Sequence, residues 1–268
     1  MKAAYLQFAP EYLNVDRNLD AAASLLEGVD ADLVVLPELF TSGYFFKSEE
    51  DLLAVAESIP EGRSTQRLKQ WARETGATLV AGLAEEEGGD VFNSAVLVRP
   101  NGSTETYRKV HLFYEETRLF APGDIGFPVF EATTRDGTHY ELGLMVCFDW
   151  YFPEAARSLA VQGADVIAHP SNLVLPHCPD SMPIRARENH VFTVTANRYG
   201  SEMKGDEELT FIGMSEICDP QGEILRRADR EGDEVGIVSF DPIHARDRKI
   251  NEMNDVLGDR RPETYVLR

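Results

Sequence analysis

Short apolar runs recur along the chain and are separated by amphipathic or turn-forming stretches. In the first half, the runs typical of buried strands are AAYLQF, DLVVLP, TLVAGLA and NSAVLV. In the second half they are ELGLMV, DVIAHP, VFTVTAN, SEIC, EILRR and VGIVSF. RPNGST and DPQG are typical of hairpin turns. This order predicts an α/β protein whose sheets are covered by helices.

Three stretches between these runs carry the period of an amphipathic helix. The first lies within residues 19–26. The second is expected to begin at a Ser64 cap and to end at Gly76. The third, PEAARSLAVQ, starts on a proline and is stopped by Gly163. No repeat or break in composition interrupts the series, so we expect a single domain over residues 1–268.

The composition excludes several classes of protein. A net charge of −20 argues against a nucleic-acid or anionic-membrane partner, because such binding needs clustered lysine and arginine. No apolar run approaches the roughly 20 residues of a membrane span, and the first residues lack the pattern of a signal peptide. We therefore expect a cytoplasmic protein whose three cysteines, Cys147, Cys178 and Cys218, are free thiols.

The acidic composition has a second feature. Only six of the 26 basic residues are lysines, against 46 acidic residues. This balance resembles that of proteins from a salt-adapted cytoplasm, and high-GC coding produces part of the same bias. Both interpretations stay open at this point.

Three ionisable residues stand where apolar runs end: Glu38 after LVVLP, Lys109 after ETYR and Cys147 after LGLMV. Taken singly, they are typical of a solvated loop, a surface charge and a core thiol. Strand ends in a layered α/β fold, however, converge on one edge. At that edge the carboxylate, the ammonium and the thiol would form one catalytic group. A thiol with a pKa of about 8.5 needs help to react. The carboxylate can take its proton, and the ammonium can stabilise the resulting anion.

A cysteine and histidine pair is the competing interpretation. Of the six histidines, only His169 also ends an apolar run, and a histidine packed in the core is the more common occurrence at such a place. The chain has no zinc-type cysteine pair, no P-loop and no glycine-rich dinucleotide fingerprint. We therefore expect neither a metal nor a cofactor.

Six ordered motifs resemble those of the nitrilase superfamily of carbon-nitrogen hydrolases, from residue 3 to about residue 240. They are VVLPELFTSGY, YRKVHLF, FAPGD, GLMVCFDWYFPE, RARENHVFTVTANRYG and FIGMSEICDPQG. The resemblance implies a four-layer α-β-β-α sandwich and homodimers that pack through their helical layers. It also implies that Glu38, Lys109 and Cys147 are the catalytic residues. Glu116 matches the family's second active-site glutamate, and Glu115 fits the spacing to FAPG less well.

The chemistry expected of these residues is thiol-dependent hydrolysis. Glu38 draws the proton from Cys147, whose sulfur attacks a carbonyl or nitrile carbon. Lys109 and the backbone N–H of Phe148 stabilise the negative charge, and Glu116 holds Lys109 in place. A thioester forms and is hydrolysed by water that Glu38 activates.

Several neighbouring residues have an open assignment. Tyr44, Phe113, Trp150 and Asn172 are candidates for lining the substrate pocket, although aromatic side chains more often fill cores. Asp149, with Pro153 and Glu154, is expected to shape the turn and start a helix rather than react. Cys178 is expected to be an exposed loop thiol and Cys218 a buried one.

The motifs do not separate the reactions of the superfamily. We expect hydrolysis of a non-peptide C–N bond in a small molecule, with an amide as the first candidate substrate and a nitrile as the second. The compact chain resembles an archaeal and bacterial group, some of whose members act on small aliphatic nitriles. A carbamoyl amidohydrolase and a non-catalytic binding subunit are further alternatives.

Overall fold

The computed structural model describes residues 1–266, in which two six-stranded sheets lie face to face. The strands of the first sheet, in spatial order, are β14 (Glu234–Ser239), β1 (Lys2–Gln7), β2 (Leu33–Val35), β3 (Thr78–Glu87), β4 (Asp90–Val98) and β5 (Thr104–Arg108). Those of the second are β13 (Ile224–Arg227), β12 (Glu216–Cys218), β9 (Phe192–Ala196), β8 (Val166–Pro170), β7 (His139–Leu144) and β6 (Val129–Thr133).

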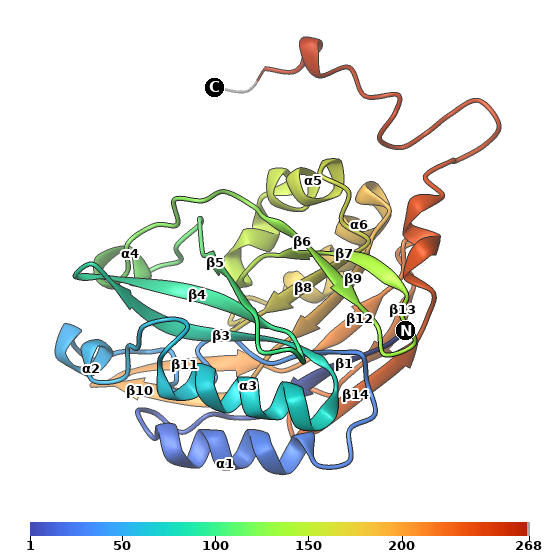
Figure 1. The fold of residues 1–268 in the computed structure, drawn as a ribbon. Helices are drawn as coiled ribbons and strands as arrows, with labels where there is room; N and C mark the ends of the chain where they lie inside the picture. Colours follow the sequence, from blue (N-terminus) through green and yellow to red (C-terminus); the bar gives the residue numbers. More distant parts are fainter. Residues whose placement is uncertain (267–268) are drawn as a thin grey trace.

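Helices cover the outer face of each sheet, so the molecule has the predicted four α-β-β-α layers (Figure 1). α1 (Val15–Leu26) and α3 (Arg63–Thr75) lie on the first sheet, and α5 (Pro153–Val161) and α6 (Cys178–Asn189) on the second. The apolar side chains between the sheets form one core, and those between the first sheet and its helices form another. Burial of alternating apolar faces explains why the sequence pattern predicted sheets covered by helices, whereas the four-layer order was implied by the resemblance to the superfamily.

The central strands of each sheet are parallel, which brings their carboxyl ends to one edge. β1, β2 and β3 run parallel, as do β7, β8 and β9, and the remaining pairs are antiparallel. β5 is antiparallel to β4, which is antiparallel to β3, so β5 also ends at this edge. The short helices α2 (Glu49–Leu53) and α4 (Glu116–Leu119) lie beside it, at the left of Figure 1.

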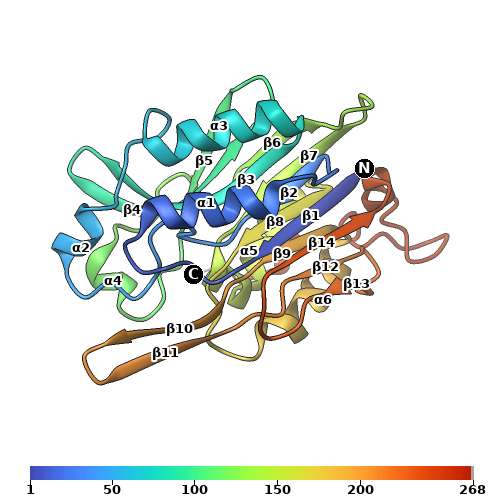
Figure 2. The ribbon, with the colours of Figure 1, turned by 90° about the horizontal axis from the view of Figure 1, so that it is seen from below.

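A hairpin that the sequence analysis did not identify projects from the same edge. β10 (Tyr199–Lys204) and β11 (Glu207–Ile212) pair antiparallel and form an arm outside both large sheets (Figure 2). Its base is held by a fully buried ion pair between Arg198 and Glu202. The Glu202 carboxylate also accepts the backbone N–H groups of Tyr44, at 3.0 Å, and Phe45, at 2.6 Å.

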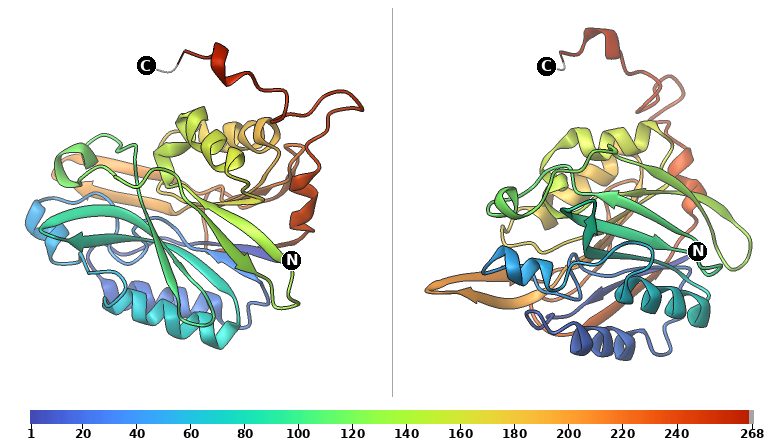
Figure 3. Two further views of the ribbon diagram at one scale, coloured as in Figure 1. Left: turned by 45° about the horizontal axis from the view of Figure 1, so that its top comes forward. Right: turned by 60° about the vertical axis from the view of Figure 1, so that its left-hand side comes forward.

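The last described residues lie outside the sheets, on the side of α5. After the 3-10 turn η2 (Pro242–Arg246), the segment runs outward past α5 and contains a last short turn, η3 (Pro262–Thr264) (Figure 3). Within residues 1–266, no helix is both long and apolar enough to cross a membrane.

Two predictions about helix starts and loops were wrong. α3 begins at Arg63 after Gly62, and Ser64 does not cap it. The carboxylate of Glu57 takes the role of a cap by accepting the N–H groups of Ser64 and Thr65, both at 3.0 Å. The capping carboxylate comes from a residue outside the positions where a helix cap is normally sought in the sequence.

Cys178 was predicted to be an exposed loop thiol, and it is instead fully buried at the start of α6. The prediction rested on the stretch PHCPD around this cysteine. The helix tolerates Pro183 because the Pro179 carbonyl, which lacks its usual N–H partner there, accepts a hydrogen bond from the Arg227 guanidinium. Cys218 is buried in β12, as predicted.

Candidate active site

Glu38 lies in the turn after β2 and is fully buried. The turn is bound to β3, because Phe40 donates its N–H to the Gly82 carbonyl at 3.1 Å. A side chain at Gly82 would place its Cβ 2.4 Å from the Cα of Glu38. Glycine at this position therefore permits the close approach that fixes the Glu38 backbone.

Lys109 directly follows β5 and is also fully buried. Its N–H donates to the Asn93 carbonyl at 2.8 Å, and its own carbonyl accepts the N–H of Gly123 at 2.9 Å. The Lys109 ammonium lies 2.8 Å from Glu38 Oε1 and 2.8 Å from Glu116 Oε1. Two carboxylates on different elements thus hold one buried ammonium.

The two oxygens of the Glu38 carboxylate have different surroundings. Oε1 accepts the Lys109 ammonium and the Asn93 side-chain amide, the latter at 2.7 Å. Oε2 is buried and has no hydrogen-bond partner within residues 1–266. A buried carboxylate oxygen is costly to leave unpaired, so this atom is a ready acceptor for a proton or for a bound water.

Cys147 ends the apolar run of β7 and begins a 3-10 turn, η1 (Cys147–Tyr151). Its φ of 42° lies in the left-handed region, which is unfavourable for a residue with a side chain. Such a conformation persists where surrounding contacts impose it, and it is common at reactive residues. The backbone N–H of Asn172 acts to lower the pKa of the Cys147 thiol, and the Asn172 side chain donates to the Glu38 carbonyl at 2.9 Å.

The electrostatics of the site follow from its burial. Burial raises the pKa of the Cys147 thiol well above its ordinary value; Glu38 raises this pKa further, and Lys109 lowers it. Burial by itself would lower the pKa of Lys109, but Glu116 and Glu38 outweigh it, so the lysine stays charged. The resting thiol is therefore neutral and needs a base at the moment of attack.

Glu116 occupies the position expected from the motif. Its Oε1 accepts the hydroxyl of Tyr44 at 2.6 Å as well as the Lys109 ammonium, and its Oε2 accepts the N–H of Phe113 at 3.3 Å. Burial raises the pKa of Glu116, an effect opposed by Lys109. The neighbouring Glu115 instead pairs with Lys204 of the arm at 2.5 Å.

The four residues considered for the substrate pocket have different environments. Tyr44 and Asn172 contact the buried glutamates, as described above. The ring of Phe113 packs on that of Phe148, with centroids 5.0 Å apart. Trp150 is buried in the core between the sheets and α6, and its carbonyl accepts the Arg185 side chain at 3.1 Å.

The surroundings of His169 favour a structural role. Its Nε2 lies 2.9 Å from the Cys147 carbonyl oxygen, and its Nδ1 lies 3.1 Å from the Thr195 hydroxyl. Burial lowers the pKa of His169 to about 4, so the ring is neutral near pH 7. It supports the backbone of the turn and does not point a free nitrogen at the thiol.

Sequence reasoning missed Asn93, which lies in β4 and donates to Glu38. The available signal was an amide side chain inside the apolar run NSAVLV, since a buried polar group needs a partner. Asp149 was predicted to be structural, and its carboxylate indeed accepts the Val146 N–H of the turn at 2.8 Å. Pro153 and Glu154 form the first turn of α5, as predicted.

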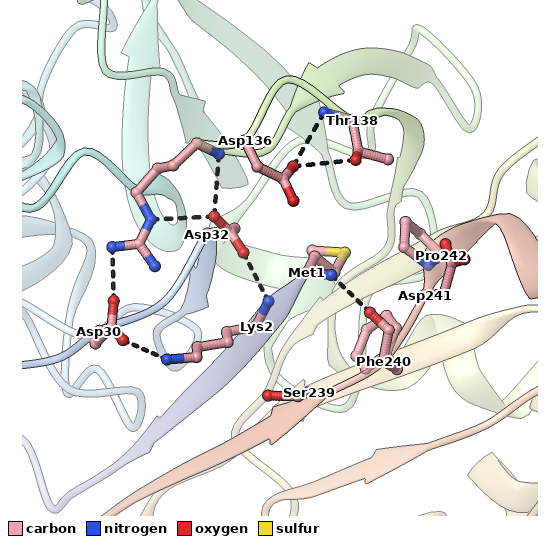
Figure 4. A pocket seen from close by; sticks show the side chains of 11 residues that line it. Met1, Lys2, Asp30, Asp32, Asp136, Thr138, Ser239, Phe240, Asp241 and Pro242 are labelled. Carbon is pink, nitrogen blue, oxygen red and sulfur yellow. Dashed lines mark hydrogen bonds and ion pairs between the residues drawn. The ribbon is translucent and has the colours of Figure 1, made fainter.

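A separate depression of about 820 Å³ lies at the opposite edge, near the amino ends of β1, β2 and β7 (Figure 4). Its walls carry the ion pairs of Lys2 with Asp30 and of Arg135 with Asp32. None of the predicted catalytic residues lines it. The buried cluster at the carboxyl ends of the strands is therefore the candidate active site.

Comparison with known proteins identifies the class of enzyme to which this fold and site correspond. The family model described as carbon-nitrogen hydrolase matches residues 2–249. The chain belongs to this family and is a carbon-nitrogen hydrolase of the nitrilase superfamily.

Particular relatives differ in their named reactions. A protein from Pyrococcus abyssi named nitrilase is 48% identical, over 99% of each chain. The crystal structure of an amidase from Nesterenkonia sp. has a TM-score of 0.79 and 30% identity, and the match covers 98% of this chain and 94% of that one. A second structure of the Nesterenkonia amidase, at 28% identity and a TM-score of 0.76 over 93% of this chain and 96% of that one, carries acrylamide added to its active-site cysteine.

Proposed function

We propose that the chain hydrolyses a small nitrile or amide to a carboxylate and ammonia through a thioester on Cys147. The observation that carries the proposal is the unpaired, buried Oε2 of Glu38, whose other oxygen is bound to Lys109. The cluster thus contains an acceptor for the thiol proton and a fixed positive charge. Nucleophilic hydrolysis needs both.

Acylation by an amide follows from this arrangement. Glu38 takes the thiol proton as the Cys147 sulfur attacks the carbonyl carbon. The oxyanion is stabilised by the Lys109 ammonium and by the backbone N–H of Phe148, which directly follows the thiol residue. When the intermediate collapses, the C–N bond breaks and the nitrogen leaves as ammonia with the proton held by Glu38.

Deacylation reverses the roles of the same groups. Glu38 removes a proton from water, whose oxygen attacks the thioester carbon. The C–S bond then breaks, and the proton on Glu38 returns to the sulfur. The products are the carboxylic acid and the free thiol, and the enzyme is restored.

A nitrile reaches the same tetrahedral intermediate as an amide, but after one additional step. Sulfur adds to the nitrile carbon, and the nitrogen receives the thiol proton, which gives a thioimidate. Addition of water to the thioimidate produces the tetrahedral intermediate that an amide forms directly, and this intermediate loses ammonia. Both substrates therefore use the same residues.

Similarity to relatives orders the two candidates. The sequence analysis put the amide first although the motifs do not separate the two reactions, whereas the 48% identity to a protein named nitrilase over nearly the full length of both chains supports the nitrile. The amidase structures support the amide at lower identity. We therefore take the nitrile as the first candidate substrate here and the amide as the second.

The test is release of ammonia from short aliphatic nitriles, from propionitrile upward, and from the matching amides. We expect turnover of at least one series by the wild type and none by Cys147→Ala with an unchanged far-UV spectrum. Iodoacetamide is expected to label Cys147 before Cys178 and Cys218, which are fully buried outside the cluster. Undiminished hydrolysis by Cys147→Ala contradicts the proposal.

Homodimerisation through the helical layer of α5 and α6 is part of the proposal. Val161 and Ile184 expose about half of their apolar side chains on these helices, 49% and 50%. The dimer is implied by the resemblance to the superfamily, and these two side chains are exposed apolar groups that this layer offers for packing against a second copy. Light scattering is expected to give the mass of a dimer for the wild type and a lower mass for Val161→Asp with Ile184→Asp. A monomeric mass for the wild type would contradict the proposed dimer.

A further inference from the structure

Asp149 is a fully buried carboxylate that accepts hydrogen bonds from both sides of the candidate active site. Its Oδ2 accepts the Tyr107 hydroxyl at 2.6 Å and the Val146 N–H at 2.8 Å. Its Oδ1 accepts the His111 N–H at 3.2 Å and lies 2.8 Å from the His111 ring Nδ1. The ring of His111 is in turn stacked on Phe152, with centroids 3.7 Å apart.

These partners flank the two proposed catalytic residues in the sequence. Tyr107 and His111 stand two residues before and two residues after Lys109. Val146 directly precedes Cys147. One carboxylate therefore connects the segment that carries the ammonium, at the end of the first sheet, to the turn that carries the thiol, at the end of the second.

We propose that Asp149 is a positioning residue that fixes the Lys109 ammonium relative to the Cys147 thiol across the two sheets. The inference rests on the proposed function, because the distance matters only if the ammonium stabilises charge formed by attack of the thiol. A misplacement of about 1 Å in such a pair costs roughly a hundredfold in rate. Asp149 itself need not touch the substrate.

Replacement of Asp149 by asparagine cuts this connection without changing the size of the side chain. If the NH2 group replaces Oδ2, it faces the Val146 N–H, a donor against a donor. If it replaces Oδ1, it faces the His111 N–H in the same way. Backbone N–H groups cannot reverse their role, so either orientation loses the bond on one side.

The experiment measures kcat per reactive thiol, because a merely structural role would lower the folded fraction and leave this ratio unchanged. Active sites are counted by stoichiometric alkylation of Cys147 with iodoacetamide in the folded fraction isolated by size-exclusion chromatography, because an unfolded chain would also be labelled at Cys147. Turnover is followed with the substrate of the propionitrile and propionamide series that the wild type hydrolyses fastest. For Asp149→Asn we expect kcat per labelled Cys147 to fall about a hundredfold, with KM changed by less than about threefold.

Asp165→Asn is the matched control. Asp165 is also fully buried and also bonds across strands, since it accepts the Glu141 N–H at 2.9 Å and the Arg246 side chain at 2.7 Å. It precedes β8, however, at the edge opposite the candidate site. We expect Asp165→Asn to lower the melting temperature and to keep kcat per labelled Cys147 within about twofold of the wild type.

A second variant keeps the inference testable if Asp149→Asn does not fold. Tyr107→Phe removes the 2.6 Å bond to Asp149 on the Lys109 side, together with the 3.2 Å bond that the hydroxyl accepts from the Val110 N–H, and leaves the Val146 bond to Asp149 in place. We expect kcat per labelled thiol to fall about tenfold, through a smaller shift of the lysine. Wild-type kcat per thiol in Asp149→Asn, or in Tyr107→Phe if that variant alone folds, overturns the positioning role. Hydrolysis by Cys147→Ala, or none by the wild type, instead overturns the proposed function and this inference with it.

Discussion

The hydroxyl of Tyr44 donates a 2.6 Å hydrogen bond to Glu116 Oε1, the same oxygen that accepts the Lys109 ammonium. The backbone of Tyr44 is itself held by Glu202 at the base of the β10–β11 arm. The arm, the loop before α2 and the charged cluster are therefore connected through one tyrosine. A change at Tyr44 reaches Lys109 through a single carboxylate.

Tyr44→Phe is expected to lower kcat about tenfold. The Glu116 carboxylate loses the hydrogen bond that the Tyr44 hydroxyl donates, and it therefore holds Lys109 less firmly. The fold should persist, since the ring keeps its edge-on contact with Phe211, at 5.9 Å between centroids. Steady-state kinetics with thermal unfolding as a control measures both effects. An unchanged kcat would mean that Lys109 and the Phe113 N–H suffice to fix Glu116.

Lys109→Arg is expected to keep the positive charge and to lose hydrolysis, because the longer, forked guanidinium does not fit between Glu38 and Glu116. Glu116→Gln is expected to weaken hydrolysis about a hundredfold through misplacement of the ammonium. Alkylation of Cys147 by a small neutral reagent should survive in both variants, since it forms no oxyanion. Near-normal hydrolysis by Lys109→Arg would show that charge alone suffices.

Glu38→Gln is expected to lower hydrolysis by about three orders of magnitude, because the amide cannot take the thiol proton. His169→Gln, which retains a donor for the Cys147 carbonyl, should keep kcat within about fivefold near pH 7.5 and reduce mainly the stability. Parallel kinetic and unfolding measurements on the two variants test this ranking. The reverse order would indicate that His169, and not Glu38, is the base that activates Cys147.

The buried His169 also predicts a pH dependence of stability. Burial lowers the pKa of its imidazole to about 4, from an ordinary value of about 6.5. Between these values the unfolded chain binds the proton and the folded chain does not, so the free energy of unfolding falls as the pH falls. The slope from this group is up to about 1.4 kcal/mol per pH unit. Urea unfolding of the wild type from pH 7 to pH 4 should show it, and the curve for His169→Gln should be shallower by that amount.

The net charge of −20 predicts a response to salt. If the surface is adapted to a salty cytoplasm, screening of its self-repulsion should raise the melting temperature markedly between low salt and about 1 M, where the Debye length is roughly 3 Å. Thermal unfolding across a series of KCl concentrations measures this effect. A flat response favours coding bias as the origin of the acidic composition.

The sequence by itself determined the layers and the position of the reactive groups along the chain. Apolar runs and helical periods are local properties, and strand ends in such a fold gather at one edge, so Glu38, Lys109 and Cys147 were expected to lie together. The motifs also distinguished Glu116 from Glu115, which bonds to the arm.

Only the tertiary structure decided how these groups are held and which of their atoms are unpaired. Contacts such as Asn93 with Glu38, or Asp149 with Tyr107, join residues distant in sequence, and Glu57 caps α3 from outside the helix. The helix that begins at Cys178 contains Pro183, and Arg227 binds the carbonyl that this proline leaves without a partner. Such bonds depend on the register and packing of strands and helices, which no local pattern encodes, because each donor meets its acceptor only after the layers have assembled.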